Sequence, residues 1–119
     1  MKDLRWDEYE EVVFVGKSIG TVVAARLAEE MNNKVRLILY TPVEATFSGK
    51  MGDAVSFIGD NDPWSIPEDV IRLAKRRGVP ISVYSGCNHS LEGKSAVDNL
   101  DILKDVMQKT KAFVESGDR

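Results

Sequence analysis

Cysteine, histidine and long apolar runs are scarce in this sequence. Its 119 residues include one cysteine, Cys87, and one histidine, His89. A single cysteine excludes an internal disulfide framework and is typical of a reducing compartment, so we expect a cytoplasmic protein. No apolar run approaches the roughly 20 residues that span a bilayer, and the N-terminal stretch MKDLRWDEYEE lacks the hydrophobic segment of a secretory signal. These absences argue against membrane association and export.

An excess of positive charge is also missing. The chain has 16 lysines and arginines against 19 aspartates and glutamates, a formal net charge of −3. The cluster KRRG at residues 75–78 is too short to attract nucleic acid or an anionic membrane, so neither is an expected partner. With 43% hydrophobic residues, a chain of this length is expected to form one globular domain over residues 1–119.

Four short apolar runs, each rich in β-branched residues and bounded by turn formers, predict strands. They cover residues 12–16, 35–40, 54–59 and 80–86. Between the first two runs, apolar residues recur with helical spacing along one face. These residues are Ile19, Val22, Val23, Leu27 and Met31. The segment is therefore predicted as strand, helix, strand.

Two more helices follow from capping patterns. Ser65 stands three residues before Glu68 and predicts the cap of a helix at about 66–77. Ser95 and Asp98 repeat the pattern before an apolar stripe that runs to the end of the chain. Residues 41–53 are predicted as a loop, either an ordinary crossover or a lid. The alternation of strands and helices predicts an α/β fold with a small, mostly parallel four-stranded sheet and flanking helices.

Residues 16–20 have the pattern Gly-x-Ser-x-Gly between a predicted strand and a predicted helix. A serine in a strained turn at this point projects its hydroxyl clear of the sheet, where side chains at Gly16 and Gly20 are expected to collide. The turn also leaves the backbone N–H of Ile19 at a helix N-terminus, which favours an oxyanion. Ser18 is therefore a candidate nucleophile. The alternative is a serine in a tight turn with no chemical role.

Two phosphate-binding patterns do not fit the same segment. A Walker loop needs a glycine five residues before Gly16, and that position holds Glu11, whose carboxylate would repel phosphate. The dinucleotide pattern Gly-x-Gly-x-x-Gly is not present in GKSIGT. A flavodoxin-like domain that binds phosphate at the same sheet edge remains a third alternative.

Polar residues follow the third and fourth predicted strands. Asp60 and Asp62 come directly after residues 54–59, and His89 comes after residues 80–86. Because parallel strands end at one edge of a sheet, these side chains are expected near Ser18. A lone histidine is often structural, and Asp-Asn-Pro runs often form turns without chemistry. The order Ser, Asp, His on three strand ends nevertheless favours a catalytic triad.

At these positions the sequence resembles the α/β-hydrolase superfamily, whose triad runs Ser, acid, His along the chain. GKSIG is similar to its nucleophile elbow, GDNDPW to its Gly-x-x-Asp acid motif and GCNHS to its histidine loop. The acid motif favours Asp62 over Asp60. The similarity covers residues 11 to about 114 and is greatest to small bacterial hydrolases of esterase type.

The resemblance implies a serine hydrolase that cleaves a small ester, thioester or amide. Ser18 would attack the acyl carbonyl, His89 would transfer the proton, and Asp62 would orient the imidazole. No metal and no organic cofactor are implied. Lys17 and Trp64 are candidate pocket residues, with solvent exposure and cover of the sheet edge as their respective alternatives. Cys87 is predicted as a small buried thiol rather than a rival nucleophile.

One departure from the resemblance concerns the first half of the fold. Members of the superfamily have several strands before the elbow, and an early loop supplies a second oxyanion N–H. Here the similarity begins with the elbow strand, so we expect a truncated fold, with residues 3–10 matching the end of the preceding helix. The strand at 12–16 then becomes an exposed apolar edge. We expect a homo-oligomer through that edge, or a partner that supplies the missing N-terminal half. The rival function is a catalytically impaired remnant that serves as an assembly or binding module.

Overall fold

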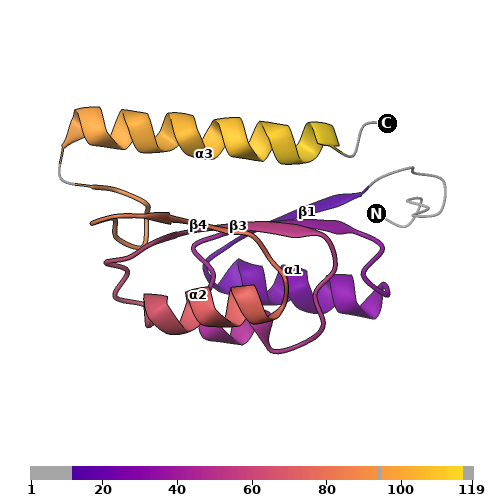
Figure 1. Cartoon of the computed structure of the whole chain (residues 1–119). Helices are drawn as coiled ribbons and strands as arrows, with labels where there is room; N and C mark the ends of the chain where they lie inside the picture. Colours follow the sequence, from indigo (N-terminus) through magenta and orange to yellow (C-terminus); the bar gives the residue numbers. More distant parts are fainter. Residues whose placement is uncertain (1–11, 94, 117–119) are drawn as a thin grey trace.

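A four-stranded parallel sheet in the order β1-β2-β3-β4 forms the centre of the molecule (Figure 1). The computed structural model describes residues 12–93 and 95–116. The strands are β1 (Val13–Lys17), β2 (Arg36–Tyr40), β3 (Ala54–Gly59) and β4 (Ile81–Tyr84). The helices are α1 (Ile19–Glu30), the short 3-10 helix η2 (Glu44–Phe47), α2 (Pro67–Arg76) and α3 (Ala96–Ser116).

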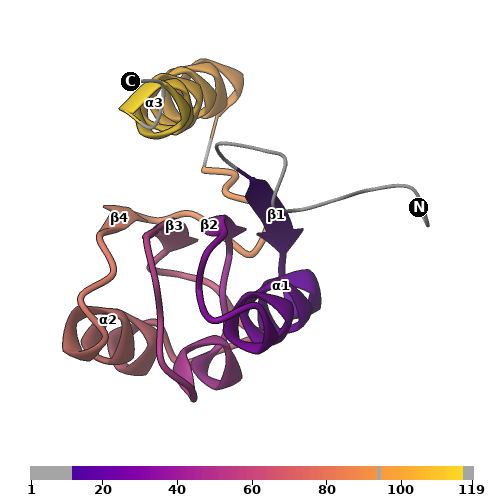
Figure 2. The ribbon, with the colours of Figure 1, turned by 90° about the vertical axis from the view of Figure 1, so that its right-hand side faces the viewer.

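The elements form three layers. Figure 2 shows α1 and α2 on one face of the sheet and α3 alone on the other. The predicted α/β class and the four parallel strands are confirmed, with β1 shifted by one residue and β4 shorter than expected. Because side chains alternate along a strand, β2 contributes to both cores. Leu37 and Leu39 pack toward α1 and α2, and Ile38 packs with Phe57 and Val106 on the α3 side.

Helix α1 turns its small side chains toward the sheet. The buried residues are Thr21, Ala24, Ala25 and Ala28. The larger apolar residues face outward instead, with Ile19 68% exposed, Val23 55% and Leu27 46%. The helical period therefore predicted the helix correctly, but it did not show which side packs, because a stripe of small residues and a stripe of large ones both fit that period.

Helix α3 also leaves most of its apolar stripe uncovered. The backbone N–H of Asp98 donates to Ser95 Oγ at 3.1 Å, so the predicted capping serine is in place. Val106 is the one fully buried residue in the described part of the helix. The exposed members of the stripe are Val97, Leu100, Leu103, Met107 and Val114. Helix α3 is thus amphipathic as predicted, but the sheet covers only part of its apolar face.

The predicted cap of α2 is wrong. The helix begins at Pro67, its N-cap residue is Ile66, and no side chain caps it. The Ser65 hydroxyl is buried and has no hydrogen-bond partner in the part of the chain that the structure describes. Proline at the first helical position lacks an N–H and has a helical φ, so this helix needs less capping than the sequence pattern suggested.

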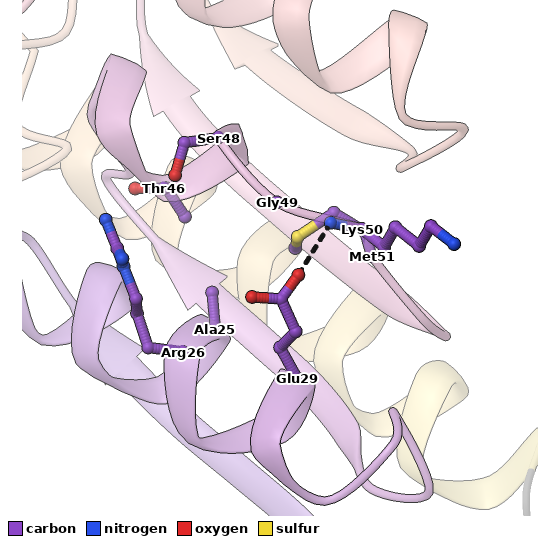
Figure 3. A pocket seen from close by; sticks show the side chains of 8 residues that line it. All are labelled: Ala25, Arg26, Glu29, Thr46, Ser48, Gly49, Lys50 and Met51. Carbon is purple, nitrogen blue, oxygen red and sulfur yellow. Dashed lines mark hydrogen bonds between the residues drawn. The ribbon is translucent and has the colours of Figure 1, made fainter.

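The loop between β2 and β3 is an ordinary crossover rather than a lid. Phe47 is completely buried in the core beside α1 and α2. Glu29 Oε2 on α1 accepts a hydrogen bond of 3.0 Å from the backbone N–H of Lys50 (Figure 3). The pocket between α1 and this loop measures only about 10 Å³, which is about the size of a single water site.

Strand β1 lies at the edge of the sheet, as expected. Within residues 12–93 and 95–116 it pairs with β2 alone, in parallel register. The helix end expected at residues 3–10 lies outside the described residues. Among the described helices, none is long and apolar enough to cross a membrane.

Candidate active site

The turn from β1 to α1 places Ser18 in a strained backbone conformation. Its φ is 56° and its ψ is −124°, a region that residues with a side chain seldom occupy. The Ser18 N–H donates to the carbonyl of Tyr40 in β2 at 2.9 Å. Its carbonyl accepts from Thr21, through the backbone N–H at 2.9 Å and through Oγ1 at 2.5 Å. Hydrogen bonds on both sides thus hold the strained residue in place.

The two glycines of the motif have different roles. A Cβ on Gly16 would lie 2.6 Å from the carbonyl oxygen of Gly20, closer than real side chains come to backbone. A Cβ on Gly20 would meet nothing within 4 Å. The predicted steric clash is therefore confirmed at Gly16, and the prediction is wrong at Gly20. The reason is that Gly20 contributes its backbone to the contact, while its own Cβ direction points into open space.

Ser18, His89 and Asp62 form a continuous chain of hydrogen bonds. Ser18 Oγ lies 2.7 Å from His89 Nε2, and His89 Nδ1 lies 2.7 Å from Asp62 Oδ2. The Asp62 side chain is completely buried, and the His89 side chain is 17% exposed. The second carboxylate oxygen of Asp62 accepts from the backbone N–H of Trp64 at 2.8 Å. Three residues up to 71 positions apart in the sequence therefore converge at the carboxyl ends of the strands.

Asp60, the other acid after β3, supports the histidine loop instead. Its Oδ1 accepts from the backbone N–H of Gly86 at 2.6 Å, and its own N–H donates to the carbonyl of Tyr84. The backbone N–H of Asn61 donates to the carbonyl of Cys87 at 3.0 Å. These bonds tie the loop after β3 to the loop after β4, and they set the position of Asp62 relative to His89.

Asn88 organises the histidine loop from within. Its Oδ1 accepts from the backbone N–H groups of Ser90 and Glu92 at 2.9 and 3.1 Å. Its carbonyl accepts from Leu91, which has a positive φ of 58°. Sequence reasoning did not identify Asn88 or Thr21 as supporting residues. The available signal for Asn88 was an asparagine within a run of turn formers, since such side chains bond the backbone two residues on.

Cys87 is a buried free thiol, as predicted. Burial raises the pKa of the thiol, and the carboxylates of Asp60 and Asp98 raise it further. A raised pKa leaves little thiolate, which is the nucleophilic form. The environment of Cys87 therefore disfavours the role of rival nucleophile.

Trp64 and Lys17 both border the triad. The Trp64 ring is 73% exposed, and its centroid lies 5.6 Å from that of His89, so it contacts the imidazole rather than covering the sheet edge. Lys17 is exposed and lines an open groove of about 430 Å³ between α3 and the strand ends. Apolar side chains form much of its wall, among them Leu91, Ile102, Val106 and Met107.

The backbone N–H of Ile19 opens α1 directly after Ser18. The first N–H groups of a helix have no intrahelical partner and carry the positive end of the dipole, so this group suits a developing oxyanion. Among the described side chains, no group of three or more His, Cys, Asp or Glu residues gathers as metal ligands would.

Comparisons with known proteins give a consistent fold. No family model matches the sequence, and no curated protein matches it either. Solved structures do match: an α/β serine hydrolase homologue from Coxiella burnetii is 20% identical with a TM-score of 0.66, over 83% of this chain and 49% of its own. Esterase 2 from Thermogutta terrifontis, phosphonylated by cyclosarin, is 16% identical with a TM-score of 0.67, over 91% and 55%. This chain has the α/β-hydrolase fold.

A third solved structure extends the likeness. A protein of unknown function from Agrobacterium tumefaciens, provisionally classed as an α/β hydrolase, is 14% identical with a TM-score of 0.67. The match covers 89% of this chain and 52% of the other. The chain thus spans about half the length of these α/β hydrolases, which agrees with the truncated fold expected from the sequence.

The two elbow glycines predict opposite effects on stability. Gly16→Ala should lower the free energy of unfolding by about 1–3 kcal/mol, because its Cβ overlaps backbone that must shift. Gly20→Ala is the matched control and should raise it by about 0.5–1 kcal/mol, since the site is open and alanine suits a helix better. Urea denaturation followed by circular dichroism measures both. Equal effects of the two substitutions would contradict this account of the elbow.

Burial of Cys87 predicts protection from alkylation. Iodoacetamide should modify the native protein orders of magnitude more slowly than the urea-unfolded chain, because the thiol is covered and its pKa is raised. Mass spectrometry over time gives both rates. Fast modification of the folded protein would show that this thiol is accessible. Cys87 would then again be a candidate nucleophile.

Proposed function

We propose that the chain is a serine hydrolase that cleaves a small ester, thioester or amide through an acyl-enzyme. One observation carries the proposal, the unbroken series from Ser18 Oγ through both ring nitrogens of His89 to Asp62 Oδ2, with both separations at 2.7 Å. A nucleophile, a base within hydrogen-bond reach and a buried group that orients the base are what this chemistry requires.

The steps follow from the geometry. With Nδ1–H of His89 donating to Asp62, Nε2 is free to accept the proton of Ser18 as Oγ bonds to the acyl carbon. The carbonyl oxygen becomes an oxyanion, toward which the N–H of Ile19 is available. The carbonyl re-forms as the bond to the leaving group breaks, and His89 returns the proton to that group. Water then repeats the sequence on the acyl-enzyme and releases the acid. No metal or organic cofactor takes part.

The surroundings of Ser18 favour a small apolar acyl or alcohol group. The groove of about 430 Å³ starts at Lys17 and Ser90, the sequence neighbours of Ser18 and His89. Its wall is mainly apolar, with Lys17 and Glu92 as charged residues at the lining. The neighbours include an esterase that reacts with the organophosphonate cyclosarin, and a serine hydrolase homologue, which supports ester cleavage as the reaction class.

The rival function, a non-catalytic module that keeps the fold, gives the opposite outcome with an active-site probe. A fluorophosphonate should modify the folded protein at Ser18, because an activated serine displaces fluoride from phosphorus. Ser18→Ala should abolish the modification, and Ser85→Ala, at an exposed serine after β4 that does not line the groove, should leave it unchanged. Peptide mass spectrometry locates the adduct. Folded protein that remains unmodified would favour the module.

Substitution of each acid by asparagine separates the role of Asp62 from that of Asp60. Asp62→Asn should slow phosphonylation by about 10³–10⁴-fold, since an amide at His89 Nδ1 favours the tautomer whose Nε2 carries a proton and cannot act as base. Asp60→Asn is the control and should change the rate little, because an amide oxygen can still accept from Gly86. Fluorophosphonate reactions quenched at a series of times give the phosphonylation rate of each variant. A larger loss at Asp60 than at Asp62 would contradict the proposed assignment.

A further inference from the structure

Trp64 contacts two members of the hydrogen-bond chain with two different parts of the same residue. Its backbone N–H donates to Asp62 Oδ1 at 2.8 Å. Its indole lies beside the His89 imidazole, with ring centroids 5.6 Å apart and an angle of 40° between the ring planes. The other carboxylate oxygen, Asp62 Oδ2, lies 2.7 Å from His89 Nδ1. Each of these three residues therefore contacts the other two.

A turn that begins at Asp62 sets the position of Trp64. The Asp62 carboxylate accepts from the backbone N–H two residues on, which is the bond of an Asx-turn. Pro63 lies between them, and its ring fixes its own φ and restricts the backbone of the residue before it. The indole is therefore attached at a point that is fixed relative to the carboxylate. Rotation of the carboxylate would break its bond to Trp64 or its bond to His89.

The indole covers the imidazole on the solvent side. The His89 side chain is 17% exposed, whereas Trp64 is 73% exposed, so the indole is the outer member of the pair. Water in its place would compete with Asp62 for the Nδ1 proton of His89, because an imidazole N–H donates to either acceptor. A side chain as exposed as Trp64 contributes little to the stability of the fold. The contact with His89 is thus the main consequence of this position.

The contact strengthens when His89 becomes positively charged. In the proposed reaction Nε2 takes the Ser18 proton as Oγ bonds to the acyl carbon, so an imidazolium forms. The face of an indole attracts a cation within about 6 Å of its centroid, and the imidazole centroid lies at 5.6 Å. An interaction that is stronger in the transition state than in the ground state lowers the barrier.

We propose that Trp64 is a positioning residue for His89, which keeps the imidazole between Asp62 and Ser18 and shields it from water. Its backbone N–H holds the acid, and its indole holds the base. A pocket wall or a cover of the sheet edge, the two roles expected from the sequence, does not require contacts with both residues. The inference rests on the proposed function, because it gives Trp64 a part in the same proton transfer.

Fluorophosphonate labelling of Ser18 tests this role. Trp64→Ala keeps the backbone bond to Asp62 and removes the ring, so phosphonylation should slow about three- to tenfold. Trp64→Phe keeps an aromatic face and should stay within about twofold of the wild-type rate. Ile66→Ala is the matched control, since it removes an exposed apolar side chain from the same loop, and should leave the rate unchanged. An unchanged rate in Trp64→Ala, or an equal loss in Ile66→Ala, would overturn the proposal.

A double variant shows whether Trp64 acts through the imidazole that Asp62 orients. In Asp62→Asn the imidazole no longer has that orientation, so adding Trp64→Ala should slow labelling by less than about twofold further. Two losses that simply multiply would show that Trp64 acts independently of the acid, and the positioning role would be wrong.

Nuclear magnetic resonance tests the contact without the reaction. His89 is the only histidine in the chain, so isotope-labelled histidine reports this site alone. The Nδ1 proton should exchange with water at least about tenfold faster in Trp64→Ala than in the wild type or Ile66→Ala, because the indole no longer covers the imidazole. Equal exchange rates would overturn the proposal. A chain that shows the faster exchange in Trp64→Ala, yet no wild-type labelling at Ser18, would support the contact and contradict the proposed function.

Discussion

The backbone conformation of Ser18 is the constraint on which the site depends. A residue with a positive φ tends to relax, and here two neighbours prevent relaxation. The N–H of Ser18 is bound to β2 through Tyr40, and its carbonyl is bound to α1 through Thr21. The hydroxyl position is therefore set by the sheet and the helix together. Gly16 is needed because the turn brings backbone to within 2.6 Å of where a side chain would begin.

The other two members of the hydrogen-bond chain are placed by contacts between loops. Asp60 accepts from Gly86, and Asn61 donates to Cys87, so hydrogen bonds fix the loop after β3 against the loop after β4. Asn88 then holds the turn that presents His89. Residues with no part in the proton transfer thus set the two 2.7 Å separations on which the proposed chemistry depends.

The exposed apolar surfaces share one cause. Helix α1 packs on the sheet through its alanines, α3 packs mainly through Val106, and both leave larger side chains outward. The α/β hydrolases that match this fold are about twice as long as the chain.

Much of this protein follows from its sequence alone. Apolar runs bounded by turn formers predicted the four strands, and helical spacing with capping patterns predicted the three main helices and hence the parallel α/β class, because burial leaves a direct imprint on residue order. The motif around Ser18 and the positions of Asp62 and His89 after strands also followed from that order. Tertiary structure decided what local patterns cannot encode. It turned the small side of α1 inward, left Ser65 without a capping role, and placed backbone against Gly16 but not against Gly20. Each of these depends on which atoms from distant segments come within a few ångströms, and only the packed chain determines that.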